Sequence, residues 1–254
     1  MDAKFNIAVL IDADNSPAGM IDEVLTELAK HGVINIRRAY GNWKSPQLTG
    51  WEAVLHEHAI QPMQQFAYSK GKNATDMAMS IDAMDLLYGK RIDGVALVSS
   101  DADFTPLVMR LRADGLKVFG FGEKKTPEPF VNACSTFLYL EHLAPAGAEP
   151  DKTATAAAPK VPVQRKSTKE LKGNARLVKL LRDSVAAEAD DDGWAALGAV
   201  GNHISKQKSF DPRNYGYARL LGLIQAIDLF DFELRGKHHY VRDRRTPSST
   251  VATE

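Results

Sequence analysis

Short apolar runs alternate with longer stretches of helical periodicity over the first 140 residues. The apolar runs predict strands at Phe5–Ile11, Val33–Ala39, Ile60–Tyr68, Val95–Ser99 and Lys117–Phe121. Between them, apolar residues recur every three or four positions and predict helices over Met20–Lys30, Thr75–Tyr88 and Phe104–Ala113. Strands that alternate with helices of this length are typical of a parallel sheet covered on both faces. We therefore predict an α/β domain of three layers over residues 1–143.

This pattern ends at Ala144, and no periodicity is sustained as far as Lys172. The segment is rich in alanine, proline and threonine, and residues 145–172 carry six basic and three acidic side chains. Such a composition is typical of a flexible linker. We expect residues 144–172 to be a flexible, basic tether.

A second unit is predicted over residues 173–245. Three helical patterns follow one another there, the last of them around Leu220–Ile227. The alternating run Phe230–Leu234 then reaches a turn at Gly236, which predicts a hairpin. Three helices followed by a hairpin form the arrangement of a winged helix. Residues 246–254 are expected to be a disordered tail.

Composition limits the class of protein and the cellular compartment to be expected. No apolar run in the 254 residues approaches the length of a membrane span, and no cleavable leader is evident. The single cysteine, Cys134, excludes an internal disulfide framework and a cysteine-rich zinc site, and we expect it in the core. These features predict a cytoplasmic protein.

Charge is distributed unevenly along a chain that is neutral overall. Residues 1–144 carry 18 acidic and 14 basic side chains, whereas the predicted linker is basic. Neutrality lowers the expectation of nucleic-acid binding for the chain as a whole. It leaves room for a protein whose phosphate contacts come from the linker and the second unit.

Acidic and amide side chains stand where predicted strands end or a helix begins. Asp12, Asp14 and Asn15 follow the first strand, Asp101 and Asp103 follow the fourth, and Asp76 opens a helix. In an open parallel sheet, ligands bind beyond the carboxyl ends of the strands, so these side chains are predicted to converge. Clustered carboxylates suit Mg²⁺ or Mn²⁺, and such a cation activates water and stabilises charge on a phosphoryl oxygen.

Each acidic residue also has a simpler interpretation. As alternatives to cation binding, Asp103 caps a helix, Asp76 interacts favourably with a helix dipole, and Asp14 belongs to a turn. Asp82 and Asp85, in the middle of a predicted helix, are expected on a solvated face or beside local partners. A carboxylate directly after a buried strand, as at Asp12, is costly unless it is paired or bound to a metal.

Glycine-rich phosphate motifs are absent after the first strand, which argues against dinucleotide binding and ordinary NTPase chemistry. Lys70 and Lys72, on either side of Gly71, either steer a phosphate backbone toward the acidic cluster or belong to a solvated loop.

The motifs of the first unit resemble the NYN domain of the LabA-like branch of the PIN-like nuclease superfamily. The matching segments are Ala8–Asn15, Gly71–Met84, Ser99–Leu107, Gly115–Gly122 and Ala133–Leu140. The resemblance implies a PIN-like, Rossmannoid fold and a metal-dependent endoribonuclease. It further implies that Asp12, Asp76 and Asp101 hold the metal, that Asp103 is a further acidic position, and that Asn15 orients Asp12 or the substrate. Ser135 departs from relatives that often carry aspartate at this place, outside the implied metal site.

Residues 173–242 resemble an OST-HTH (LOTUS) domain. The resemblance rests on Phe210–Gly216, on the helix that follows, and on the hairpin. It implies RNA binding, and in some animal proteins the binding of a helicase. Because Asp190, Asp191 and Asp192 form a surface that repels RNA, binding is expected on basic residues elsewhere: Arg213, Arg219, Arg235, Lys237 and Arg242.

The preferred hypothesis is a Mg²⁺- or Mn²⁺-dependent endoribonuclease that acts on single-stranded RNA and holds it through the winged helix. One alternative keeps the fold and RNA binding without catalysis, with the winged helix also open to a protein partner. Another is a phosphatase of the haloacid dehalogenase type, because Ile11–Asp14 after an apolar strand matches its opening motif. In that case Asp12 would be a nucleophile and Asp76 would have no role.

Overall fold

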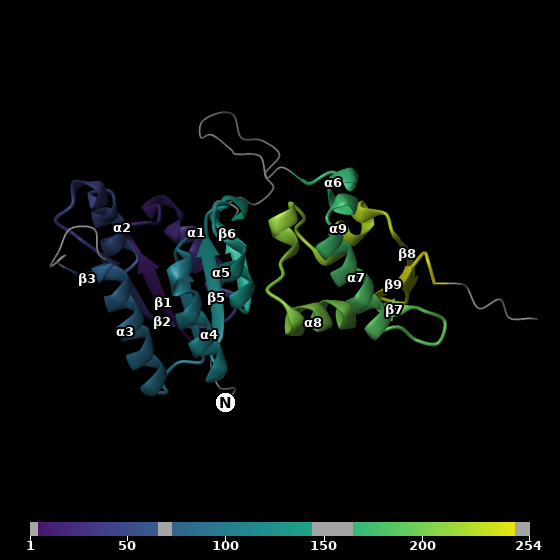
Figure 1. The fold of residues 1–254 in the computed structure, drawn as a ribbon, viewed down its shortest axis with the longest axis horizontal. Coiled ribbons are helices and arrows are strands. Elements are labelled where there is room, and N and C mark those ends of the chain that lie inside the picture. The colour runs from purple at the N-terminus through teal and green to yellow at the C-terminus, as the bar shows by residue number, and fades with distance from the viewer. Residues whose placement is uncertain (1–4, 66–72, 144–164, 247–254) are drawn as a thin grey trace, which may run out of the picture. The chain divides into compact units, whose positions relative to one another are not determined.

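The computed structural model describes residues 5–65, 73–143 and 165–246 (Figure 1). The chain divides into two compact units, Met1–Val161 and Pro162–Glu254, and each is described by itself.

A parallel sheet forms the centre of the first unit. Its strands are β1 (Asn6–Asp12), β2 (Val33–Gly41), β3 (Gln61–Gln64), β4 (Gly94–Val98), β5 (Lys117–Gly122) and β6 (Thr136–Tyr139). They lie in the order β3-β2-β1-β4-β5-β6, and every neighbouring pair is parallel. The chain moves outward in one direction from β1 and then in the other direction from β4. The reversal of order therefore falls between these two central strands.

Alternate residues of β1 are buried in two different hydrophobic cores. Ile7, Val9 and Ile11 pack with α1 (Ile21–Ala29) and α2 (Trp51–Glu57) on one face of the sheet. The other face, which includes Ala8 and Leu10, is covered by three helices. These helices are α3 (Ala74–Tyr88), α4 (Thr105–Ala113) and α5 (Glu128–Ala133). A strand covered on both faces is apolar throughout, which confirms the predicted three-layer α/β fold.

The shortest elements escaped the periodicity analysis. Helices α2 and α5 span seven and six residues, too few for a recurring apolar stripe. Strand β3 covers Gln61–Gln64, so it is shorter than the predicted Ile60–Tyr68. Its first two residues are exposed at the edge of the sheet, and positions 66–68 lie outside the described residues.

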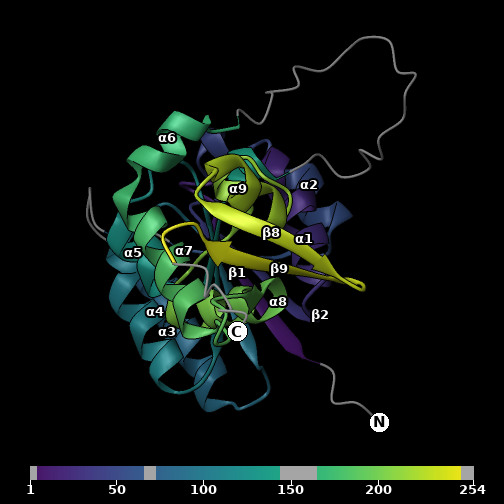
Figure 2. The same cartoon turned by 90° about the vertical axis from the view of Figure 1, so that its right-hand side faces the viewer.

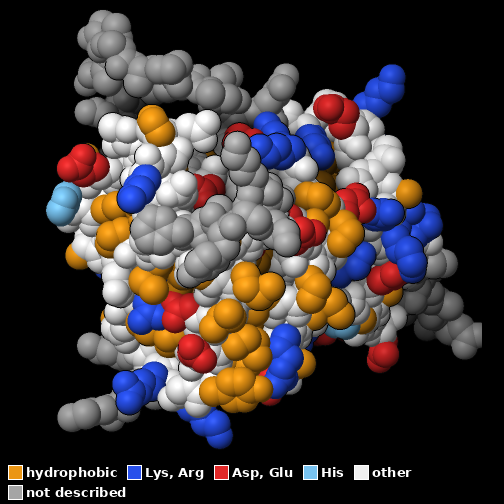
Figure 3. Space-filling view, turned by 60° about the vertical axis from the view of Figure 1, so that its left-hand side comes forward, with side chains coloured by type: hydrophobic (Ala, Val, Ile, Leu, Met, Phe, Trp, Pro, Cys, Tyr) orange, Lys and Arg blue, Asp and Glu red, His pale blue; other side chains and the backbone are white. Residues whose placement is uncertain are grey.

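Helix α3 carries apolar side chains outward as well as toward the sheet. Met77, Ile81 and Tyr88 are exposed along it, and Met109 is exposed on neighbouring α4. Figure 3 brings the α3 side forward and shows hydrophobic side chains gathered on this face. Because α3 is apolar on both sides, it departs from the amphipathic helix that the sequence predicted.

The second unit combines helices with a small antiparallel sheet, as expected for a winged helix. Its helices are α6 (Thr168–Gly173), α7 (Ala175–Ala187), α8 (Leu197–Gln207) and α9 (Leu220–Ile227), with a 3₁₀ turn, η5, at Pro212–Tyr215. Strands β8 (Phe230–Arg235) and β9 (His238–Asp243) form the hairpin in front in Figure 2, and β7 (Ala195–Ala196) pairs with β9. All contribute to one hydrophobic core.

Helix α6 corrects the expected extent of the linker, which was predicted to reach Lys172. The hydroxyl of Ser167 accepts a hydrogen bond from the backbone of Glu170, and the Glu170 carboxylate accepts one in return from the backbone of Ser167. Leu171 then enters the core of the unit. A helix of six residues with one buried apolar side chain gives no periodicity, although Ser-x-x-Glu is the signature of a capping box. The rest of the expected linker, 144–164, and residues 247–254 of the expected tail lie outside the described residues.

Within the described part of the chain, no helix has both the length and the apolar character that crossing a membrane requires.

Candidate functional site

The predicted acidic residues lie at the carboxyl ends of the two central strands. Asp12 is the last residue of β1, and Asp101 and Asp103 follow β4, its neighbour in the sheet. Asp76 lies in the first turn of α3, which packs on β1 and β2. The site therefore occupies the point where the order of the strands reverses, which is where open α/β sheets bind ligands.

Asp12 is fully buried and held by two side chains. Nδ2 of Asn15 donates to both of its carboxylate oxygens, at 3.2 and 3.1 Å, and the Ser99 hydroxyl donates to Oδ2 at 2.9 Å. Burial raises the pKa of Asp12, the hydrogen bonds from Ser99 and Asn15 oppose that shift, and the charge of Asp14 adds to it. Asn15 thus orients Asp12, one of the two roles implied for it.

Ser99 connects Asp12 with the loop after β4. Its Oγ accepts a hydrogen bond of 3.1 Å from the backbone N–H of Asp101. The Asp101 carboxylate in turn accepts a hydrogen bond of 2.8 Å from the backbone N–H of Asp103 and caps the 3₁₀ turn η3 (Ala102–Phe104). The capping role considered for Asp103 therefore belongs to Asp101. The Asp103 carboxylate accepts a hydrogen bond of 3.3 Å from Asn73 instead.

The pKa of Asp76 indicates that the carboxylates lie close together. Its pKa is raised to about 6, first by burial. Further contributions come from the negative charges of Asp12, Asp101, Asp103 and Asp14, in that order. The dipole at a helix N-terminus acts in the opposite sense, since it favours the ionised carboxylate. Repulsion and burial outweigh it here, so Asp76 is more than a helix-dipole residue.

Asp14 belongs to the same cluster, although the sequence also allowed a plain turn residue. Its carboxylate accepts hydrogen bonds from the Thr75 hydroxyl at 3.0 Å and from the backbone of Asn42 at 3.3 Å. These contacts tie the loop after β1 to the end of β2 and the start of α3. A signal was present in the sequence, because Asp-Ala-Asp begins at the last residue of β1 and the same tripeptide follows β4 at residues 101–103.

Asp82 and Asp85 lie apart from this cluster. Asp82 accepts hydrogen bonds from Arg38 and from the Tyr40 hydroxyl, both on β2. The pKa of Tyr40 is raised, mainly by burial and then by Asp82. Asp85 is exposed on α3. The expectation of local partners or a solvated face for these two residues is confirmed.

The acidic cluster fits a hard divalent cation, because carboxylate oxygens are the ligands that Mg²⁺ and Mn²⁺ prefer. Among the described residues, however, no three Asp, Glu, His or Cys side chains are arranged as ready ligands of one ion. Both oxygens of Asp12 are engaged by Asn15, and one of them also by Ser99. Like charges that share a site repel one another, and each such charge raises the pKa of its neighbour.

A hollow of about 490 Å³ adjoins the acidic cluster. Asp14, Asn15 and Ser16 line it from the loop after β1, and Trp51, Glu123 and Lys125 line it from other segments. Lys125 is paired with Glu123 at 2.5 Å, so its charge is compensated. Lys70 and Lys72, expected to steer phosphates to the cluster, lie outside the described residues.

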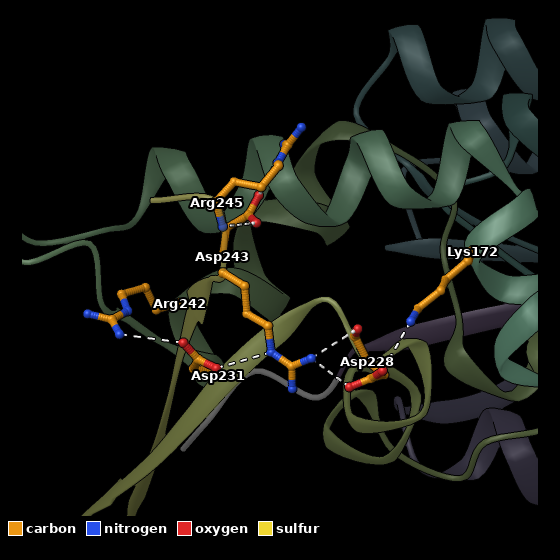
Figure 4. Close-up of polar contacts among 7 residues, drawn as sticks. Lys172, Asp228, Asp231, Arg242, Asp243 and Arg245 are labelled. Atoms are coloured by element: carbon orange, nitrogen blue, oxygen red, sulfur yellow. Dashed lines mark hydrogen bonds and ion pairs between the residues drawn. The ribbon is translucent and has the colours of Figure 1, made fainter. Parts of the chain in front are cut away.

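Three of the five basic residues expected to contact RNA in the second unit are paired with carboxylates. Arg213 binds Asp211, two residues away in the chain, through both Nε and Nη2, at 3.0 and 2.8 Å. Arg235 pairs with Glu233, and Arg242 pairs with Asp231. Figure 4 shows the Arg242–Asp231 pair joined through Arg244 to Asp228 and Lys172, and a separate pair between Asp243 and Arg245. Arg219 and Lys237 are exposed.

Comparison with known proteins agrees with this arrangement. The family model of the NYN domain matches residues 6–141, more than half of the chain. The chain belongs to the NYN domain family. The model of the OST-HTH/LOTUS domain matches residues 172–242 of this NYN protein. NYN domains belong to a nuclease superfamily, and OST-HTH domains are associated with RNA.

Three similar proteins carry names that describe them as uncharacterised or of unknown function. The uncharacterized protein MJ0482 of Methanocaldococcus jannaschii is 32% identical over 124 residues, which are 47% of this chain and 48% of the relative. The matched region thus spans about half the length of that curated relative. The protein of unknown function VPA0982 from Vibrio parahaemolyticus is 22% identical, with a TM-score of 0.45 over 55% of this chain and 94% of its own. An uncharacterized protein from locus NE0665 of Nitrosomonas europaea is 32% identical, with a TM-score of 0.27 over 37% of this chain and 94% of its own.

Proposed function

We propose that this NYN protein is a divalent-metal-dependent endoribonuclease whose OST-HTH domain holds the RNA. The observation that carries the proposal is the surroundings of Asp76. Four other carboxylates, from the ends of β1 and β4, act on its charge and help to raise its pKa to about 6. Such a concentration of negative charge at a strand-order reversal opposes folding unless a cation compensates it, and it is typical of a functional site.

Asp12, Asp76 and Asp101 would hold Mg²⁺ or Mn²⁺. A cation bound there supplies activation of a water molecule and neutralises charge on the phosphoryl oxygens. The chain's own residues prepare the site: Asn15 and Ser99 orient Asp12, and the backbone of Asp103 fixes Asp101. The Asp103 and Asp14 carboxylates add negative charge at Asp76, which raises its pKa and would also attract a cation.

The substrate in this proposal is single-stranded RNA in the cytoplasm. Buried Cys134, the single cysteine of the chain, forms no disulfide and is consistent with a reducing compartment.

The test is cleavage of a labelled single-stranded RNA by the full-length protein in Mg²⁺ or Mn²⁺. We expect cleavage that EDTA abolishes and that Asp101→Asn reduces by at least about 10³-fold, since that variant loses a charged ligand. Asp85→Asn is the matched control because it removes one exposed carboxylate from α3, outside the cluster, and we expect it to cleave normally. Undiminished cleavage in EDTA would contradict the proposal.

One observation favours a second candidate, an RNA-binding adaptor without catalysis. No three potential ligands in the described residues are arranged as a ready metal site. A binding measurement separates the two functions. A nuclease should gain thermal stability from Mg²⁺ in the wild type and lose that gain in Asp76→Asn, whereas an adaptor should bind RNA equally well in EDTA and show neither effect.

A further inference from the structure

Two basic residues at the start of the second unit lie against tyrosines of the loop around η5. The guanidinium carbon of Arg165 is 6.0 Å from the centre of the Tyr217 ring, and Nζ of Lys166 is 5.0 Å from the centre of the Tyr215 ring. Both distances are within the range of cation–π contacts. Phe210 extends the aromatic group, with its ring centre 5.9 Å from that of Tyr215.

Hydrogen bonds fix this segment to the loop. The backbone N–H of Lys166 donates to the carbonyl of Tyr215 at 3.1 Å, and the Tyr217 hydroxyl donates to the carbonyl of Lys166 at 2.8 Å. The capping box of α6 begins at the next residue, Ser167. These hydrogen bonds and the capping box therefore hold the backbone of Lys166 in place beside the loop.

The charge of this surface is largely uncompensated. Arg165, Lys166 and Lys169 are exposed, as is Arg219, two residues beyond Tyr217. In the described parts of the chain, no carboxylate forms an ion pair with any of these four cations. The nearby Glu170 is engaged by Ser167, and its pKa is lowered mainly by that hydrogen bond, with a smaller contribution from Lys166.

The hairpin offers a weaker surface for phosphates. The guanidinium of Arg235 pairs with Glu233 at 2.8 Å and approaches Asp190 at 3.6 Å. Arg242 pairs with Asp231, and its guanidinium carbon lies 4.8 Å from the centre of the Trp194 ring. A phosphate must displace a carboxylate at each of these arginines, so less affinity is gained from the release of counterions.

We propose that the surface formed by Tyr215, Tyr217, Arg165, Lys166, Lys169 and Arg219, here called the tyrosine face, binds single-stranded RNA. This inference rests on the proposed RNA-binding role of the OST-HTH domain and assigns it a surface. Bases stack on the two rings and displace the cations that lie there, and the displaced cations move to the flanking phosphates. Stacking platforms edged by basic residues are the general solution for binding single strands without a sequence requirement.

The experiment measures the binding of the full-length protein to a fluorescein-labelled oligouridine of about 20 nucleotides by fluorescence anisotropy. EDTA is present throughout, so that cleavage does not interfere. Arg165→Gln/Lys166→Gln removes two charges from the tyrosine face. We expect about tenfold weaker binding and a slope of log K against log salt that is shallower by about 1.4, at about 0.7 per lost phosphate contact. The comparison variant, Arg235→Gln/Lys237→Gln, removes two charges from the hairpin, the surface expected from the sequence to contact RNA. Because Arg235 is paired with Glu233, we expect a smaller loss of affinity than in the tyrosine-face variant.

A second variant tests stacking separately from charge. Tyr217→Ala should weaken binding about fivefold to tenfold with an unchanged salt slope, and Tyr217→Phe, which keeps the ring, should restore most of the affinity. Thermal unfolding identifies any variant that fails to fold, and the glutamine pair leaves both rings in place. A larger loss in the hairpin variant than in the tyrosine-face variants would overturn the inference.

The outcomes also separate this inference from the proposed function. Loss of cleavage in every condition, with tyrosine-face binding as expected, would contradict the nuclease and leave the inference standing. Normal cleavage of a short RNA at saturation, with unchanged binding by all tyrosine-face variants, would overturn the inference alone and assign the face to a protein partner. Absence of RNA binding by the wild type would overturn both the inference and the RNA-binding role on which it rests.

Discussion

The hydroxyl of Ser99 donates a hydrogen bond of 2.9 Å to Oδ2 of Asp12, across the carboxyl ends of β4 and β1. Ser99→Ala leaves a buried carboxylate with one donor fewer, and the pKa of Asp12 should rise further because this hydrogen bond lowers it. We expect cleavage about tenfold slower and stability reduced by about 1 kcal/mol, the usual value of such a bond. Cleavage at saturating RNA and urea unfolding measure the two effects.

Ser135→Ala is the control for that variant. The Ser135 hydroxyl accepts a hydrogen bond of 3.0 Å from the backbone of Val118, at the amino ends of the strands and away from the acidic cluster. It should reduce stability to a similar extent without slowing cleavage. Equal loss of activity in both variants would show that Ser99 acts only through stability.

The raised pKa of Asp76 predicts a stability that falls as pH rises. Without metal, folded Asp76 keeps its proton up to about pH 6, whereas the unfolded carboxyl loses it near its ordinary pKa of 3.8. Between these two values the folded state binds more protons, so the free energy of unfolding decreases with pH. In EDTA at about pH 7.5, Asp76→Asn should therefore be more stable than the wild type. After discounting for solvent screening of this partly exposed group, the gain is on the order of 1 kcal/mol.

Urea unfolding at pH values below 4 and above 7 tests this prediction. The gain of Asp76→Asn should vanish at the acid end, and Mg²⁺ should reverse the order of stabilities at the neutral end. Asp85→Asn, on the same helix, should show no comparable pH dependence. A gain that is equal at both ends of the pH range would mean that the charge of Asp76 is not its cause.

The surroundings of Asp76 argue against a phosphatase of the haloacid dehalogenase type. In that alternative Asp76 would have no role, whereas its pKa is raised by burial and by the charges of the neighbouring carboxylates, of which Asp12 contributes most. We expect beryllofluoride to form no adduct on Asp12 and small phosphomonoesters not to be hydrolysed. Mass spectrometry of a trapped phospho-aspartyl peptide containing Asp12 would contradict this prediction and favour the phosphatase.

Because the two units have separate hydrophobic cores, we expect the first to cleave RNA by itself and the second to add affinity for RNA. The first unit has its own cores on both faces of the sheet, and the second unit has another. A chain ending at Leu143 should still fold and cleave at saturating RNA. It should bind long RNA more weakly and with a shallower salt dependence, because it lacks the basic residues beyond residue 144. Identical affinity and salt dependence for both chains would instead assign the OST-HTH domain to a protein partner.

Much of this architecture could be predicted from the sequence because long elements carry their own pattern. The continuous apolar run of β1 predicts a strand buried on both sides, and Ile7 and Ala8 do enter opposite cores. Helix α6 and the short β3 could not be delimited in this way, because six or fewer residues show too little periodicity.

The sequence predicted which residues lie at the site but not how they are hydrogen-bonded. Strand ends and a helix start predicted that Asp12, Asp101 and Asp76 converge, and the resemblance to a known family implied that they hold a metal. The role of Ser99 and the cap provided by Asp101 depend on side-chain directions after β4, which spacing alone does not give. Arg213 shows the same limit, since its pairing with Asp211 depends on the backbone of η5.

The hydrogen bond between Ser99 and Asp12 joins residues 87 positions apart in the chain. Contacts of such high sequence separation form late, because the closure of a long loop must precede them. During synthesis the N-terminal strand leaves the ribosome well before β4, so a nascent chain that lacks Ser99 and Asp101 has no assembled site. The order of the strands therefore means that the acidic cluster is assembled only after β4 and the loop that follows it have been synthesised.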